Sequence, residues 1–313
     1  MMEKTNAHLP SPTHHRPIFI AGPTAVGKSA IALALAERIG GEIISVDSMQ
    51  VYRGLDIGTA KPTAEERARV RHHLLDICDL SEAFDAAQFV RLAQVAVAEI
   101  AARGRTPIFC GGTGLYFKAF ISGLGEAPPA DAALRAELET TSFPELLREL
   151  RERDPECYEQ IDQANPRRVV RAVEVIRLTG KKFSAQRAEW KPEARSQEPE
   201  AKFFCFTRPV EEMHRRINVR VDEMFARGLV AETRELLNHG LAENKFAMQA
   251  IGYRQVAEHL RGELTLAETV ELVKIKTRQF AKRQLTWFKR HGNCEWVELS
   301  GETMEEVLQR ITA

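Results

Sequence analysis

The residues best suited to chemistry lie near the start of the chain, where residues 22–29 read GPTAVGKS. This run matches the phosphate-binding pattern G-x-x-x-x-G-K-[ST] and lies between an apolar segment and an Ala/Leu-rich segment with helical spacing. Glycines let several backbone N–H groups face one anion, and the start of the helix adds positive dipole character. A Gly-rich turn with an incidental lysine is the structural alternative. We predict that a diphosphate or nucleotide binds here, on Gly22, Pro23, Thr24, Ala25, Val26, Gly27, Lys28 and Ser29, with Mg²⁺ on Ser29.

The usual companion of such a loop in an ATPase or GTPase is an apolar strand that ends in an acid supporting Mg²⁺. The segment 43–46 leads to Asp47, but it follows the P-loop helix directly, and the segment 107–110 leads to Gly-Gly-Thr without an acid. The sequence has no N-K-x-D guanine signature and no obvious lid with paired arginines. The pattern favours a phosphate-binding fold without the usual hydrolysis machinery.

A second group of special residues follows in DSMQVYRGLDIGTAKP, residues 47–62. Further motifs come in order along the chain: HHLLD at 72–76, GGTGLYF at 111–117, PRRVVR at 166–171, AIGYR at 250–254 and TRQFAKRQLTWF at 277–288. With these motifs the chain resembles the tRNA dimethylallyltransferases (tRNA isopentenyltransferases) of bacterial type, from about Pro17 to about Val297.

The resemblance implies an activity. The family transfers a dimethylallyl group from its diphosphate to the exocyclic amine of the adenine on the 3′ side of the anticodon, in tRNAs that read codons starting with U. The P-loop in that family binds the isoprenoid diphosphate, which agrees with the missing hydrolysis machinery. We therefore expect a magnesium-dependent transferase whose partners are dimethylallyl diphosphate and the anticodon stem-loop of tRNA.

Three residues are candidates for catalysis. Asp47 ends a predicted strand, where a carboxylate could accept a proton from the weakly nucleophilic amine; support of Mg²⁺ and a helix cap are its alternatives. Thr113 ends the third predicted strand and could orient the amine or the diphosphate, or simply cap the next helix. The resemblance places Arg220 on the leaving diphosphate, whereas a solvated helix face is its alternative.

Two basic groups are candidates for tRNA binding, and the second of them is the cluster of Arg167, Arg168 and Arg171 in the predicted insertion. Lys274, Arg278 and Lys282 recur every four residues on a predicted helix with no acid from 272 to 294, a stripe that could neutralise RNA phosphates or merely be solvated. Trp287 and Phe288 could stack on bases, although core packing is their more common fate. Together with the resemblance, this gives tRNA contacts at Asp47, Ser48, Met49, Gln50, Thr113, Arg135, Arg167, Arg168, Arg171, Gln249, Gly252, Tyr253, Arg254, Lys274, Arg278 and Lys282.

Positioning these residues requires an α/β fold. Buried strands are predicted at 17–21, 42–46, 106–110, 202–207 and 294–299, with helices at 29–39, 85–103, 166–180, 210–227, 230–239, 247–261 and 266–291. The alternation indicates a P-loop NTPase-like core with a parallel sheet. We expect a leader at 1–16, the first part of the core at 17–123, a helical insertion that contacts tRNA at 124–200, and the second part of the core with basic helices at 201–313.

Composition sets outer limits on these predictions. The 313 residues include 44 Lys and Arg against 44 Asp and Glu, so any nucleic-acid site must be a local patch. The five cysteines are scattered without a C-x-x-C pair, and His72 and His73 would point to opposite faces of a strand, so we assign them no metal. Because the N-terminus lacks an apolar signal region and no segment is long enough to span a bilayer, we expect a cytoplasmic protein, and we expect a monomer.

Three other functions fit parts of the sequence. An isopentenyltransferase for free adenine nucleotides would share the P-loop and Asp47 but would not need an RNA-binding insertion. A P-loop small-molecule kinase would bind ATP and need a lid. A non-catalytic tRNA-binding protein would bind RNA without isoprenoid turnover.

Overall fold

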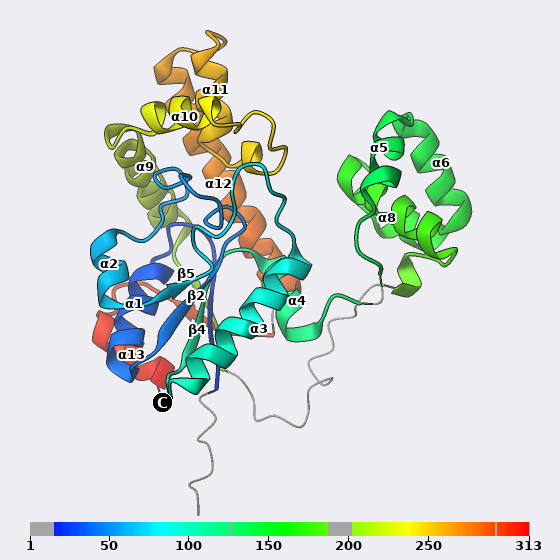
Figure 1. The fold of residues 1–313 in the computed structure, drawn as a ribbon. Coiled ribbons are helices and arrows are strands. Elements are labelled where there is room, and N and C mark those ends of the chain that lie inside the picture. Colours follow the sequence, from blue (N-terminus) through cyan, green and yellow to red (C-terminus); the bar gives the residue numbers. More distant parts are fainter. Residues whose placement is uncertain (1–15, 126, 187–201, 292, 313) are drawn as a thin grey trace, which may run out of the picture. The chain divides into compact units, whose positions relative to one another are not determined.

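The sheet at the centre of the fold places the functional loops. The computed structural model describes residues 16–125, 127–186, 202–291 and 293–312. Its six parallel strands follow the order β3-β2-β4-β1-β5-β6 (Figure 1). The strands are β1 Ile18–Ala21, β2 Glu42–Val46, β3 His72–His73, β4 Pro107–Gly111, β5 Lys202–Thr207 and β6 Glu295–Glu298. The predicted parallel α/β sheet is confirmed, and the two-residue β3 is formed by His72 and His73, which the sequence analysis had treated as strand residues.

Apolar side chains cover both faces of the sheet. Along β1, Ile20 joins a buried cluster with α1 and the C-terminal helix, while its neighbour Phe19 faces the other way and packs on Phe109 with ring centroids 4.9 Å apart. Phe117 and Phe288 extend this aromatic layer. Successive strand residues point to opposite faces, so a run of consecutive apolar residues buries both sides.

The helices follow the predicted order with a few corrections. They are α1 Lys28–Ile39, α2 Ala64–Arg69, α3 Ala86–Ala102, α4 Gly114–Ser122, α5 Ala132–Thr140, α6 Phe143–Arg153, α7 Pro155–Gln160, α8 Pro166–Thr179, α9 Val210–Ala226, α10 Leu229–Asn238, α11 Tyr253–Leu260, α12 Leu266–His291 and α13 Met304–Thr312, with 3-10 turns at Ser184–Gln186 and Ala247–Gln249. The continuous helix predicted over 247–261 is wrong, because Gly252 adopts a φ of 101° and separates a 3-10 turn from α11. Helices α2 and α13 were not predicted.

The chain divides into two compact units, Met1–Phe117 with Glu198–Ala313, and Lys118–Gln197. The second unit contains helices α5 to α8, which pack around Leu138, Leu150, Val169 and Val173. The sequence analysis placed the insertion at 124–200, whereas the second compact unit is Lys118–Gln197. The predicted linker, 190–200, and the leader apart from Arg16 lie outside the described residues. No helix in the described ranges is long and apolar enough to cross a membrane.

Candidate active site

A cleft of about 820 Å³ opens in the first unit, at the carboxyl edge of the sheet. The P-loop follows β1, Asp47 follows β2 and Gly112 follows β4, so the ends of three neighbouring parallel strands bring these loops together. Helices α9 and α12 complete the lining. The chain leaves β1 towards β2 on one side and returns beside β1 as β5 on the other, and ligands of open α/β sheets bind at such a switch point.

The P-loop has the backbone geometry that its glycines predict. Gly22 has a φ of 141°, and a Cβ there would lie 2.5 Å from the Phe206 carbonyl oxygen, so only glycine fits. Lys28 opens α1 and its ammonium donates to the Pro23 carbonyl at 2.6 Å. Burial lowers the pKa of Lys28 to about 8, partly opposed by the Asp47 carboxylate. A bound diphosphate would give this ammonium the negative partner that the cleft itself supplies only weakly.

Two arginines and a glutamine brace this loop, and the sequence analysis missed all three. Arg216 Nε donates to the Ala25 carbonyl and Arg208 Nε to the Val26 carbonyl, both at 2.8 Å. Gln284 of α12 accepts from the Thr24 N–H at 2.8 Å and donates to the Gly112 carbonyl at 3.0 Å, which ties the P-loop to the loop after β4. Gln284 lies within the TRQFAKRQLTWF motif, which was the available signal.

Asp47 divides its carboxylate between the loop and the cleft. Its Oδ1 accepts from the backbone N–H groups of Met49 at 2.8 Å and Gln50 at 3.2 Å, while Oδ2 has no hydrogen-bond donor among the described residues. The side chain lines the cleft. The turn-capping alternative is therefore realised by one oxygen, and the other remains available for chemistry.

Thr113 supports this loop from the next strand. Its hydroxyl accepts from the Ser48 N–H at 3.2 Å, and its own N–H donates to the Val46 carbonyl at 3.2 Å. Thr113 lies beside the cleft and is not among its lining residues. In this conformation the hydroxyl orients the segment after Asp47.

Arg220 and its neighbours make the cleft positive. Five basic side chains line it, against the three acids Asp47, Glu212 and Glu223; the basic ones are Lys28, Arg215, Arg216, Arg220 and Arg227. Arg220 is half-buried, and burial lowers its pKa while the Asp47 carboxylate opposes that shift. Arg220 therefore lines the cleft and is not only on a solvated helix face, and its contact with the leaving diphosphate stays a prediction.

The cleft suits a magnesium ion that arrives with a diphosphate. Ser29 lies in the first turn of α1 and lines the cleft. The described residues contain no cluster of three or more His, Cys, Asp or Glu that could hold a metal alone. Mg²⁺ commonly uses one or two protein oxygens and takes its other ligands from substrate phosphates and water, so the single hydroxyl fits that pattern.

The predicted stripe on α12 is only partly exposed. The Lys274 ammonium makes ion pairs with Asp222 at 2.8 Å and Glu271 at 2.9 Å, and its side chain is 13% exposed. Arg278 donates to the Asn218 amide oxygen at 2.7 Å. Lys282 is exposed. The structure therefore does not present one helix face on which Lys274, Arg278 and Lys282 are all free for RNA, because α9 packs against that side of α12.

The second predicted basic cluster is also divided. Arg135 and Arg171 both pair with Glu174, a fully buried carboxylate, at 3.0 and 2.5 Å. Arg167 and Arg168 are exposed in the first turn of α8. Arg135 and Arg171 thus hold their own unit together, while the other two are accessible.

The candidates around α11 differ in accessibility. Tyr253 is fully buried, and its hydroxyl donates to Glu232 at 2.6 Å and accepts from the Gly58 N–H at 3.1 Å. Gly252 is buried as well, whereas Gln249 and Arg254 are exposed. Direct contact of Tyr253 with RNA is not available in this conformation; its role is to hold the loop after β2. Phe288, for which core packing was the more common fate, is buried.

Comparison with known proteins decides the family. A family model described as IPP transferase matches residues 50–291. The chain belongs to this family. It is 47% identical to tRNA dimethylallyltransferase 1 of Trichlorobacter lovleyi, over 90% of this chain and 93% of that protein, and 46% identical to the tRNA dimethylallyltransferase of Geobacter metallireducens, with coverages of 92% and 94%.

Solved structures agree with the sequence relatives. The tRNA isopentenylpyrophosphate transferase of Bacillus halodurans superposes with a TM-score of 0.69 at 40% identity, covering 95% of this chain and 94% of that one. A eukaryotic dimethylallyltransferase described as acting on tRNA gives 0.74 at 28% identity, covering 90% and 74%. The resemblance drawn from the motifs and the P-loop NTPase-like fold are confirmed, and the chain is an enzyme of the tRNA dimethylallyltransferase group.

Proposed function

We propose that this protein transfers a dimethylallyl group from dimethylallyl diphosphate to the exocyclic amine of the adenine 3′ to the anticodon, in tRNAs reading codons that start with U. The diphosphate would lie on residues 22–29 with Mg²⁺ on Ser29. The observation that carries the proposal is the shared cleft: the Lys28 ammonium, the Arg220 guanidinium and an unpaired oxygen of Asp47 all line it.

The reaction joins the amine nitrogen to the allylic carbon as the carbon–oxygen bond to diphosphate breaks. The leaving diphosphate carries the bonding electrons, and Lys28 and Arg220 offset its growing charge. A magnesium ion held by Ser29 and the diphosphate would supply further positive charge there. Asp47 Oδ2 accepts the proton that the amine gives up. Atoms and charge balance without any further reactant.

The target adenine must leave the stack of the anticodon loop before it can reach Asp47. Unstacking costs a few kcal/mol, which contacts from residues 47–50 and from basic surfaces would offset. We propose the exposed Arg167 and Arg168 and the exposed cations of α12 for this role, together with Gln249 and Arg254. The insertion, residues 124–200, would contact tRNA, and the enzyme would work as a cytoplasmic monomer.

One incubation tests the proposal. The protein is mixed with Mg²⁺, dimethylallyl diphosphate and bulk tRNA, and nucleosides from the digested tRNA are analysed by mass spectrometry. An isopentenyl mass added to adenosine is expected in the tRNA.

Parallel mixtures with AMP or ATP in place of tRNA test whether the protein is instead a transferase for free nucleotides. A mixture without the isoprenoid tests whether it is instead a small-molecule kinase. ATP turnover that depends on a small-molecule acceptor, or transfer to AMP alone, would overturn the proposal. Tight tRNA binding without any isoprenoid product would favour the non-catalytic alternative.

A further inference from the structure

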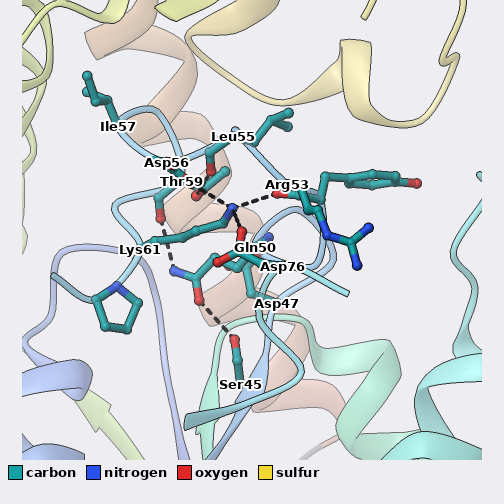
Figure 2. Close-up of polar contacts among 12 residues, drawn as sticks. Ser45, Asp47, Gln50, Arg53, Leu55, Asp56, Ile57, Thr59, Lys61 and Asp76 are labelled. Carbon is teal, nitrogen blue, oxygen red and sulfur yellow. Dashed lines mark hydrogen bonds and ion pairs between the residues drawn. The ribbon is translucent and has the colours of Figure 1, made fainter. Parts of the chain in front are cut away.

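Lys61 is a buried cation close to the cleft that the reaction itself does not use. Its side chain is 2% exposed. The ammonium has three donor protons, and it donates to three oxygens: the Tyr52 carbonyl at 2.6 Å, Asp56 Oδ1 at 2.7 Å and Asp76 Oδ1 (Figure 2). A buried charge is tolerated only when it is paired and fully hydrogen-bonded, and Lys61 meets both conditions.

Two of these oxygens, those of Tyr52 and Asp76, come from two segments that lie side by side. The backbone of residues 50–53 pairs with that of 76–78, through bonds from the Asp76 N–H to the Gln50 carbonyl at 3.2 Å and from the Ile77 N–H to the Val51 carbonyl at 2.8 Å. Asp76 itself has a φ of 54°, and Arg67 holds its second oxygen at 2.7 Å. Lys61 therefore joins the far end of the loop after β2 to both segments.

The same loop sets the position of Gln50 in the cleft. The Gln50 amide nitrogen donates to the carbonyls of Thr59 at 3.1 Å and Ala60 at 3.3 Å, directly before Lys61 in the chain, and its oxygen accepts from the Ser45 hydroxyl at 2.8 Å (Figure 2). Gln50, Thr59 and Ala60 all line the cleft. The Gln50 backbone N–H also donates to Asp47 Oδ1, so the turn that ends at Lys61 is connected to the proposed base through one residue, Gln50.

We propose that Lys61 is a positioning residue for transfer. Its ammonium fixes the turn 55–60, the turn carbonyls orient Gln50, and Gln50 together with the Asx turn at Asp47 presents the free carboxylate oxygen to the amine. The inference rests on the proposed function, because it concerns the geometry of that same reaction. In this proposal the charge of Lys61 acts on the geometry of the site and not through contact with substrate.

The test compares Lys61→Met with wild type. Methionine keeps the length of the side chain and removes the charge and all three donated bonds. Misplacement of a reacting group by about 1 Å can lower a rate about 100-fold, so we expect kcat to fall about 10- to 100-fold. The KM for dimethylallyl diphosphate should stay within about twofold of the wild-type value, because none of the three oxygens that Lys61 holds belongs to the P-loop.

Binding stoichiometry distinguishes positioning from a structural effect. Calorimetric titration with dimethylallyl diphosphate counts folded sites, and kcat is expressed per site. Full stoichiometry with a lowered kcat supports the proposal. A kcat per site equal to that of wild type overturns it, whether or not part of the protein has unfolded. Failure of wild type to transfer the group would instead reject the proposed function.

Two further variants keep the test decisive if Lys61→Met does not fold. Asp56→Ala removes one of the three acceptors from a side chain that is 56% exposed, so folding should persist, and kcat should fall severalfold. Wild-type kcat in Asp56→Ala would overturn the proposal. The matched control is Arg67→Met, which removes the other cation of Asp76 and contacts only the Pro62 carbonyl besides; its kcat should stay within about twofold of wild type.

Discussion

Asp47, the proposed base, shows at the scale of one residue how a loop fixes the orientation of a carboxylate. One carboxylate oxygen accepts two backbone N–H groups, and the side chain lines a cleft with five basic side chains. Thr113 holds the next residue of the loop from a different strand. A side chain fixed at one oxygen loses little conformational freedom when the amine approaches the other, so its orientation is set before substrate binds.

Substitution of Asp47 separates the roles of base and metal support. Asp47→Asn keeps size and hydrogen-bonding reach but removes the charge, so turnover should fall about 10²- to 10⁴-fold, the usual contribution of a positioned general base. Affinities for tRNA and dimethylallyl diphosphate, measured by equilibrium titration, should change far less. Asp79→Asn, on an exposed side chain paired with Arg53, is the control.

The dependence of the Asp47→Asn rate on the magnesium concentration gives the outcome that would contradict the base assignment. If Asp47 supports the ion, excess Mg²⁺ should partly restore the rate of Asp47→Asn, and the base assignment would then be wrong. Full activity at ordinary Mg²⁺ would exclude both roles.

At the scale of elements, α12 carries part of its exposed charge on a different face from the one that four-residue spacing suggested. Lys276, Arg283 and Arg290 are exposed and recur every seven residues, which is close to two helical turns. None of the three makes an ion pair within the described part of the chain, and Arg283 lies 5.8 Å from the ring of Phe280, which lines the cleft. This face, rather than Lys274 and Arg278, is the better candidate for RNA phosphates.

Replacing Lys276, Arg283 and Arg290 together by Ala should weaken tRNA binding and flatten its salt dependence. Each lost phosphate contact lowers the slope of log K against log salt by about one unit. Filter binding or anisotropy across a salt series measures the slope. Lys274→Met is the control and should keep the wild-type slope, because its ammonium is already paired. An unchanged slope in the triple variant would mean that this face is only solvated.

A buried carboxylate, that of Glu42, stabilises the amino-terminal end of β2, opposite the end that leads to Asp47. Glu42 is 3% exposed and accepts from His73 Nε2 and from Arg103, each at 2.7 Å, so it joins β2 to β3 and to the end of α3. Burial alone would raise the pKa of Glu42, but the bonds from Arg103 and His73 lower it to about 2. The pKa in the unfolded chain is about 4.5, so the ionised carboxylate stabilises the fold above that pH, and the contribution disappears as pH falls from about 4.5 to 2.

Glu42→Gln should therefore lower the free energy of unfolding at pH 7 by up to about 3 kcal/mol, the equivalent of the pKa difference. The gap between variant and wild type should narrow as pH is lowered from 5 to 3, which urea unfolding at each pH can follow. Glu37→Gln removes an exposed partner of Arg69 and should have a much smaller effect. A gap that is constant with pH would contradict the linkage.

At the scale of the whole molecule, two hydrophobic cores coexist in one chain. The core of the unit Lys118–Gln197 surrounds α8, and Glu174 lies fully buried beside it. Its carboxylate accepts from Arg135, Arg171 and the Asp131 N–H, and these bonds lower its pKa although burial raises it. Since each unit closes over its own apolar residues, damage to one should leave the other protected.

Glu174→Gln tests this independence. Breaking a buried ion pair typically costs about 3–5 kcal/mol, here within one unit. Hydrogen exchange should accelerate in α5 to α8 and stay unchanged in β1, β2 and β4. Glu149→Gln, which removes a partly exposed partner of Arg177, should accelerate exchange less. Uniform acceleration through the sheet would show that the two units unfold together.

The sequence alone determined the phosphate loop, Asp47 at the end of a strand and the parallel sheet. These features depend on local spacing: glycines where the backbone must turn, apolar runs that bury both faces of a strand, and a polar residue at its carboxyl end. The family motifs added the activity. The phosphate loop and each strand can be read within about ten residues of chain, whereas the family resemblance depends on motifs spread from about Pro17 to about Val297.

Tertiary structure decided which cations are free and which residues brace the site. The sequence analysis took Lys274 and Arg135 as tRNA contacts, but the fold pairs them with Asp222 and Glu174, each of which lies on a different helix. Tyr253 and Gln284 act on loops about 195 and 260 residues away in sequence, and helical spacing cannot show which face a distant element will cover. Charge neutralisation and burial are properties of contacts, so they became visible only when the sheet had brought the strand ends together.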